Sequence, residues 1–244
     1  MKRTIEPNLE NRSARESDAP RTLTEVAYRR IRADIVWGVL PPGSSLRSDD
    51  LRARYNVGIS PLREALSRLA TERMVTSIGQ RGFRVATISI ADVIDVTETR
   101  LILERAALTR SVEKGDVHWE ANVVAAFHAL SRQPIPKSQG FEAEQWASQH
   151  RAFHMTLLSA CGSQWQMSLA GLLFDQAERF RIVRLTKVPN QKLARDTTIE
   201  HKTIVDAVLD RNAKKAADAL EQHYRATTDE VIADMRRTAG GSDD

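Results

Sequence analysis

Cysteine is almost absent from this sequence of 244 residues, and long apolar runs are missing altogether. The single thiol, Cys161, excludes an internal disulfide and any metal site built from several cysteines. It lies in an apolar run, where we expect it to be buried and inert. No stretch approaches the ~20 apolar residues of a membrane span, and the N-terminus lacks the apolar core of a signal peptide. We therefore expect a soluble, cytoplasmic protein.

The sequence also lacks the common motifs of catalysis, and its clearest bias is in charge. Gly-x-Ser-x-Gly, a phosphate-binding glycine loop and His-Glu-x-x-His are all missing. Residues 1–90 hold 16 Lys and Arg against 10 Asp and Glu, whereas residues 91–244 hold 20 against 22. A basic first third joined to a neutral remainder is typical of a phosphate-binding module attached to a regulatory domain.

The segment Ser-Pro-Leu-Arg-Glu-Ala-Leu at residues 60–66 predicts the start of a helix. Ser60 suits the N-cap, Pro61 the first helical position and Glu64 the positive end of the helix dipole. The apolar residues share one face and leave the arginines toward solvent, where they meet a polyanion or form an ordinary charged surface. The buried face would hold Leu62, Leu66 and Leu69, and the exposed face Arg63, Ser67 and Arg68.

Elements on both sides of this helix predict a winged helix-turn-helix domain over residues 22–88. Apolar spacing predicts helices over residues 24–38 and 48–55, and a turn containing Gly58 joins the second of them to the helix at Ser60. Two strands joined by a basic, glycine-rich tip follow, at residues 75–78 and 83–86. Three helices and a hairpin form this domain, and the polar residues 1–21 before it are expected to form a mobile arm.

Three motifs stand in order along this domain: Leu40-Pro41-Pro42-Gly43, Pro61-Leu62-Arg63-Glu64-Ala65-Leu66 and Arg81-Gly82-Phe83-Arg84-Val85. They resemble the DNA-binding domain of GntR-family bacterial transcription regulators. Many members of that family have an arginine where this chain has Ile59, so the base preferences of the family are not transferred. The resemblance implies DNA contacts at Arg47, Ser60 and Arg63, and at the wing tip, Gln80, Arg81 and Gly82.

From Ile90 onward the apolar spacing is helical throughout. It predicts an all-α bundle of six helices over residues 89–237, followed by a tail at 238–244. The fold class is therefore mainly α, with an N-terminal winged helix-turn-helix and a C-terminal six-helix bundle. The expected helices cover residues 90–114, 116–130, 142–161, 163–188, 193–210 and 213–237, and the clearest loop covers 133–140.

Four of the six histidines are placed to meet inside this bundle. His150 and His154 are four residues apart and project from one apolar helical face. His201 and His223 stand eleven residues before and after Asn212, at the turn of a helical hairpin, so they lie at the same height across it. A further helix that brings His150 and His154 to that level would complete a site of four nitrogens.

Four imidazoles suit zinc, nickel, copper or iron far better than magnesium or calcium, and we expect zinc or nickel first. Neutral imidazoles leave the full charge of the cation in the cavity, so the site should attract an anion, such as a small carboxylate, to an open coordination position. The alternative is that each histidine is an ordinary hydrogen-bonded core residue, which is the usual role of a lone inward histidine.

Residues of the bundle also resemble the FCD effector domain of the FadR-like branch of GntR regulators. The resemblance implies a divalent metal held by one Asp and three His, and His150 stands at the Asp position, which leaves the ligand number and the metal open. Arg100 is a candidate second clamp for an effector, or else an ion-pair partner of Glu104 on its own helix. The matching residues are Thr99-Arg100-Leu101-Ile102-Leu103-Glu104, Phe153-His154, His201 and His223.

The sequence thus predicts a homodimeric DNA-binding transcription regulator, a repressor by analogy with the family. Its recognition helices would enter successive major grooves of an inverted repeat, and a small organic acid in the metal-containing cavity would change operator affinity. Three alternatives stay open: a metal-dependent hydrolase fused to a DNA-binding module, a regulator whose metal is only structural, and an architectural DNA-binding protein without a ligand.

Overall fold

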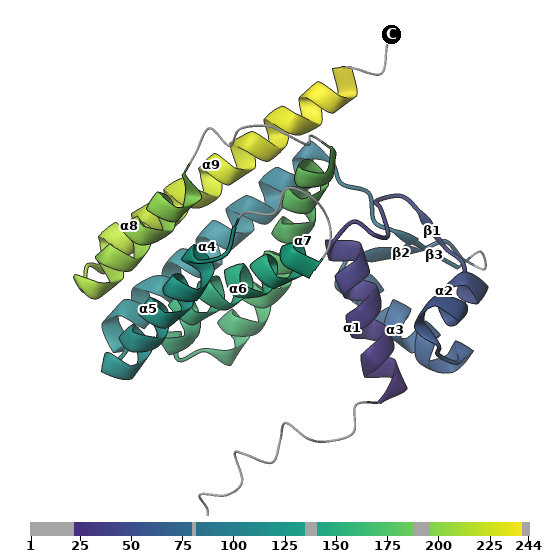
Figure 1. Cartoon of the computed structure of the whole chain (residues 1–244), viewed down its shortest axis with the longest axis horizontal. Coiled ribbons are helices and arrows are strands. Elements are labelled where there is room, and N and C mark those ends of the chain that lie inside the picture. The colour runs from purple at the N-terminus through teal and green to yellow at the C-terminus, as the bar shows by residue number, and fades with distance from the viewer. Residues whose placement is uncertain (1–21, 80–81, 135–140, 188–195, 241–244) are drawn as a thin grey trace, which may run out of the picture.

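The computed structural model describes residues 22–79, 82–134, 141–187 and 196–240. It consists of a small N-terminal head, residues 22–88, and a helical body, residues 89–240 (Figure 1). Three sequence expectations lie outside the described residues: the arm at 1–21, the two wing-tip residues Gln80 and Arg81, and most of the loop at 133–140. The mainly α fold class predicted from the sequence is confirmed.

The head is a three-helix domain with a small antiparallel sheet. The sheet has the strand order β1-β3-β2 and joins the expected hairpin to one further strand. That strand, β1, was not expected, because two residues show no periodicity. The elements are α1 (Leu23–Val36), β1 (Ser45–Leu46), α2 (Ser48–Tyr55), α3 (Ile59–Thr71), β2 (Val75–Ser77) and β3 (Phe83–Val85).

The start of α3 differs from the prediction. Gly58, not Ser60, is the N-cap residue, and the helix begins at Ile59. Pro61 is tolerated as the third helical residue because the first N–H groups of a helix have no intrahelical partner. As a result Glu64 lies beyond the first turn, where it accepts a hydrogen bond from the Thr24 hydroxyl at 2.9 Å.

Apolar side chains of all three helices and of the sheet form one core in the head. The faces predicted from spacing are confirmed, because the leucines of α3 are at most 1% exposed. Asn56, in the left-handed region at φ 52°, ends α2 and turns the chain toward α3. The largest fully buried side chains of this core are Ile31, Leu62, Leu66, Leu69 and Met74.

Six α-helices form the body in the described part of the chain, as the sequence predicted. Side-chain caps at Ser89, Asp116 and Asp196 fix the starts of three of them. The third helix ends in a short 3-10 turn, and the last runs three residues further than expected. The elements are α4 (Ile90–Lys114), α5 (Val117–Ser131), α6 (Phe141–Leu158), η3 (Ser159–Cys161), α7 (Gln164–Lys187), α8 (Thr197–Leu209) and α9 (Ala213–Gly240).

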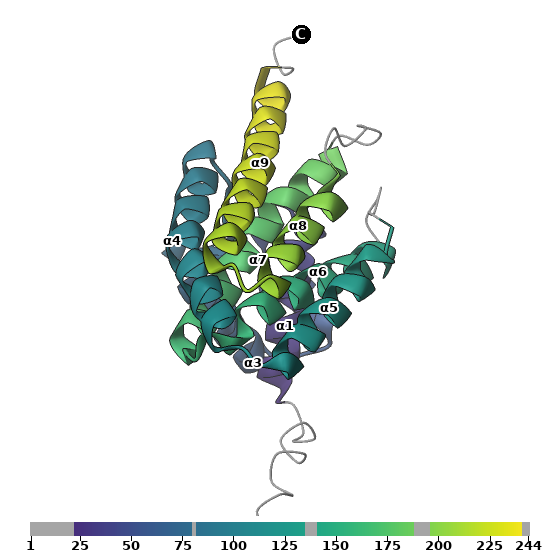
Figure 2. The same cartoon turned by 90° about the vertical axis from the view of Figure 1, so that its left-hand side faces the viewer.

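The helices of the body pack around a second apolar core. Figure 2 shows α4 beside α9, α8 against α9, and α5 against α6. Cys161 is buried and free, as expected. Among the described helices, none is long and apolar enough to cross a membrane. The largest fully buried side chains of this core are Leu108, Phe153, Leu157, Leu158, Ile204 and Leu220.

Candidate metal centre and nucleic-acid interface

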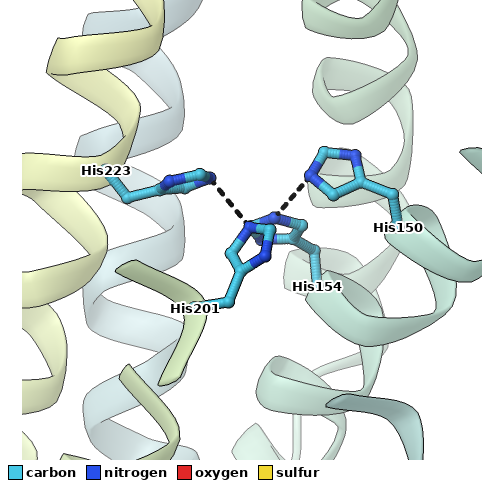
Figure 3. Close-up of side chains that lie close together, drawn as sticks. All are labelled: His150, His154, His201 and His223. Carbon is cyan, nitrogen blue, oxygen red and sulfur yellow. Dashed lines mark hydrogen bonds between the residues drawn. The ribbon is translucent and has the colours of Figure 1, made fainter. Parts of the chain in front are cut away.

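Four histidines from three helices meet inside the body (Figure 3). His150 and His154 come from α6, His201 from α8 and His223 from α9. Their Nε2 atoms face one another in two pairs: 3.1 Å separates those of His150 and His154, and 3.3 Å those of His201 and His223. All four residues are at most 7% exposed. The hairpin geometry expected around the turn at Asn212 is therefore present.

These separations suit a single transition-metal ion. Tetrahedral ligands at about 2.0–2.1 Å from zinc lie about 3.3 Å apart, close to the spacing within each pair. One ligand atom from each histidine can be chosen so that all four lie within 4.8 Å of one another. The widest of these separations would have to close by up to about 1.5 Å for a regular tetrahedral site, so the two pairs would move toward each other on binding.

Acidic and phenolic groups behind the histidines fix which ring nitrogen carries the proton. The Tyr224 hydroxyl donates to Glu104 at 2.6 Å, so at 3.2 Å it can only accept the proton on Nδ1 of His154. Nδ1 of His223 lies 2.7 Å from a carboxylate oxygen of Glu200 and donates to it. In both rings the Nε2 lone pair is left to face the other histidines.

His150 differs from the other ligand candidates in its surroundings. Its Nδ1 lies 3.5 Å from a carboxylate oxygen of Glu178, within ion-pair range, but no hydrogen bond forms and the atom is buried without a hydrogen-bond partner. The ring stacks on Trp146 at a centroid distance of 4.5 Å. His150 is thus held by stacking on Trp146 and by the contact of its Nε2 with His154.

Burial keeps the rings of His150 and His154 neutral. It lowers the pKa of His150 to about 4, although Glu178 opposes the shift, and burial together with the neighbouring imidazoles lowers the pKa of His154 much further. Burial would raise the pKa of Glu178, but Arg181 and His150 lower it to about 2. At neutral pH His150 and His154 are therefore neutral imidazoles beside the ionised carboxylate of Glu178, and neutral imidazole is the form that binds a metal cation.

A cavity adjoins the four histidines. The volume that the centres of water molecules can occupy in it is about 70 Å³. Arg100 lines this cavity together with the histidines and Tyr224. Arg100 forms the ion pair with Glu104 that the sequence offered as an alternative, at 2.8 Å, and its guanidinium lies 3.9 Å from the Tyr224 ring centroid. Burial disfavours its charge, but Glu104 raises the pKa of Arg100, so a cation faces the cavity.

The head presents a separate polar surface on α3. Ile59, Ser60, Arg63 and Ser67 are exposed on the side away from the core, and Arg63 makes no ion pair with any described residue. Arg68 is also exposed, but its guanidinium bonds Glu25 at 2.9 Å and lies 3.7 Å from the Tyr28 ring centroid. Of the two arginines, only Arg63 keeps its donors for an outside acceptor.

The start of α3 is also open to an anion. No side chain caps it and no acidic residue lies in its first turn, whereas side chains cap α1, α4, α5 and α8. Backbone N–H groups at a helix start favour phosphate. Arg47, the exposed N-cap residue of α2, and Gly82, which adopts a φ of +96° in the wing, belong to the same domain.

Comparison with known proteins matches both parts of the chain. Residues 23–85 match the family described as "Bacterial regulatory proteins, gntR family", and residues 95–226 match the FCD domain. BphR of Paraburkholderia xenovorans (strain LB400), an uncharacterized HTH-type transcriptional regulator, is 39% identical over 214 residues, which are 85% of this chain and 84% of that protein. This chain belongs to the GntR family.

Other GntR-family relatives agree. The HTH-type transcriptional repressor GlaR of Escherichia coli (strain K12) is 34% identical over 204 residues, covering 83% of this chain and 93% of that protein. The solved structure of E. coli McbR/YncC has the same fold, with a TM-score of 0.74 over 87% of this chain and 98% of that one at 16% identity. The chain is a DNA-binding transcription regulator with an FCD effector domain, and its relatives are regulators, not enzymes.

Sequence reasoning missed the groups behind the histidines in this GntR-family member. Glu104 was considered only as a partner of Arg100, and Tyr224, Glu178 and Glu200 were not considered at all. Glu178 lies in the run Asp175-Gln176-Ala177-Glu178-Arg179, which is polar yet buried apart from the alanine. Polar residues that break the apolar stripe of an otherwise buried helix could have pointed to it.

We expect Glu200→Ala to weaken metal binding by roughly 10–100-fold, because His223 loses the carboxylate that fixes its tautomer. Competition with a chromogenic chelator measures this affinity. The control is Glu98→Ala, which removes an exposed carboxylate paired with Arg225 on the surface. Equal metal affinity in the two variants would show that Glu200 does not orient His223 for a metal.

Proposed function

We propose that this GntR-family regulator is a homodimeric repressor whose affinity for an inverted-repeat operator is set by a small carboxylate, bound at a metal ion in the four-histidine cavity. The observation that carries the proposal is the convergence of four buried imidazoles whose Nε2 atoms face one another at 3.1 and 3.3 Å. DNA binding itself follows from the family, while the metal, the effector and the dimer are the proposed parts.

The Nε2 lone pairs left on His154 and His223 support a resident cation. Each is directed at a nitrogen of a neighbouring imidazole, at 3.1 and 3.3 Å, where two or more rings could share one ion. Burial keeps His150 and His154 neutral, so no charged imidazole of this pair opposes the cation. His150, His154, His201 and His223 would hold the ion, and imidazole ligands favour zinc or nickel. Such a metal supplies a Lewis-acidic centre with its full charge to any anion that enters the cavity.

The size and charge of the cavity support a small carboxylate as the effector. A buried water needs about 10–15 Å³ of such space, so 70 Å³ corresponds to about five to seven water positions, which suits a small organic acid and excludes a long chain. Arg100 has guanidinium donors left after its ion pair with Glu104, and it lines the same space. A carboxylate could bridge this guanidinium and the metal.

The operator-binding surface comprises Arg47, Ser60 and Arg63 in the head, and the wing tip formed by Gln80, Arg81 and Gly82. One recognition helix contacts only a few base pairs, so a dimer on an inverted repeat supplies the specificity that a genome demands. GlaR and RspR of Escherichia coli (strain K12) are described as HTH-type transcriptional repressors, which supports repression as the sign of control.

Titration calorimetry on the zinc-loaded full chain tests this function with butanoate, succinate, glutarate and benzoate. We expect at least one of them to bind, and to weaken binding to a duplex selected from a randomised pool by at least about fivefold. The metal-free protein should not respond. Metal retention without binding of any member of the series would favour a purely structural metal and contradict the proposal.

A further inference from the structure

Helix α7 lies between the four-histidine cavity and the head (Figure 1). Three of its side chains, Phe174, Glu178 and Arg181, are spaced by four and three residues, share one face and line the cavity. Of the residues between them, Asp175, Gln176 and Arg179 contact the head instead. Within this stretch, polar side chains are 3–7% exposed, namely those of Asp175, Gln176, Glu178 and Arg179.

Two of the contacts with the head reach backbone carbonyls at the ends of DNA-binding elements. Gln176 donates from Nε2 to the carbonyl of Glu72, which caps the end of α3, at 2.6 Å. Arg179 donates to the carbonyl of Ala86, just after the wing strand β3, at 2.8 Å. It also donates to Oε1 of Gln176 at 2.8 Å, so one buried network holds both carbonyls.

The third contact joins the head to the helix that carries two of the histidines. The carboxylate of Asp175 accepts a hydrogen bond from Nε of Arg151 at 3.2 Å, and it also forms an ion pair with Arg32 of α1. Arg151 directly follows His150 on α6. A single buried carboxylate therefore connects α1 of the head, α7 and the segment of α6 that positions a ligand of the metal.

We propose that α7 transmits the binding of an ion in the four-histidine cavity to the head as a change in position, with Asp175 as the coupling residue. This inference rests on the proposed function. Gathering the imidazoles around an ion moves α6 and Glu178 together, and Asp175 passes the shift to Arg32. The contacts of Gln176 and Arg179 oblige the end of α3 and the wing to follow, because leaving such buried groups unpaired is unfavourable. The recognition helix then turns relative to the body.

The test uses the full chain, zinc alone as the ligand, and a duplex selected from a randomised pool by the wild type. We expect zinc to change the DNA affinity of the wild type by at least about fivefold. In Asp175→Asn this change should fall below about twofold, while the zinc content and the zinc-free DNA affinity stay at wild-type levels. By reciprocity, saturating DNA should shift the zinc affinity of the wild type equally and leave that of the variant unchanged.

Arg32→Gln is a second test of the coupling, because it removes the partner of Asp175 in the head and because Arg32 does not line the cavity. The control is Asp218→Asn, which removes a carboxylate of α9 paired with Arg105 and should keep the full response. A full zinc response in both Asp175→Asn and Arg32→Gln would overturn the coupling role, as would a zinc-loaded wild type whose DNA affinity does not change. A wild type that retains no metal would instead contradict the proposed function.

Discussion

Replacing His201 by alanine is expected to strip the metal from the purified protein. His201 supplies one of the two nitrogens that face each other at 3.3 Å, and its loss leaves three ligands. If the ~10–16 kcal/mol typical of a structural zinc site is shared evenly, one ligand carries about 3 kcal/mol, or roughly a hundredfold in affinity. Mass spectrometry of metal content after dialysis measures the loss.

The matched control for this variant is His128→Ala, because His128 is an exposed histidine of α5. That variant should keep its metal. The effector response should disappear together with the metal in His201→Ala, whereas its DNA affinity should stay within about twofold of that of the zinc-free wild type, since the head has its own apolar core. Full metal content in His201→Ala would place the site elsewhere.

Arg63→Ala is expected to lower operator affinity by ~1–3 kcal/mol per half-site, or roughly 5–150-fold, if the side chain reads a base. Arg63 is exposed on α3 beside Ser60 and pairs with no described carboxylate. Fluorescence anisotropy with the selected duplex and with a scrambled one distinguishes an arginine that contacts a base from one that contacts a phosphate. Loss of a phosphate contact would weaken binding to both duplexes alike. It would also reduce the slope of the logarithm of the binding constant against the logarithm of the salt concentration by about one.

Arg68→Ala serves as the comparison on the same helix. Its guanidinium is tied to Glu25 and lies over Tyr28, so we expect its loss to affect the stability of the head and to leave the preference between duplexes unchanged. If Arg68→Ala relaxed the sequence preference and Arg63→Ala did not, the orientation of α3 on DNA would have to be reversed.

Much of the fold could be predicted because its helices carry clear apolar stripes. The leucines of α3 indicated its buried face, and the apolar spacing from Ile90 onward predicted the six helices of the body. The two-residue strand β1 could not be found in this way, because its pairing with β3 depends on the tertiary fold. The N-cap was misplaced because Ser60 has the side chain of a capping residue, whereas the backbone of Gly58 takes that position.

The candidate site could be predicted in part for a geometric reason. Equal distances from the turn at Asn212 require His201 and His223 to meet, whatever the rest of the fold. No local rule places α6 at the same height, so its two histidines could be joined to the site only by hypothesis. The role of α7 stayed hidden because its polar residues face two partners and no single apolar stripe marks its orientation.

X-ray absorption spectroscopy at the zinc edge, on zinc-loaded full-length protein, tests the four-histidine centre most directly. We predict a first shell dominated by imidazole nitrogen at about 2.0–2.1 Å, with the multiple-scattering pattern of several histidine rings, which His201→Ala should lose. A shell made only of water and carboxylate oxygens, with no imidazole scattering, would contradict the proposal that these four histidines hold a metal.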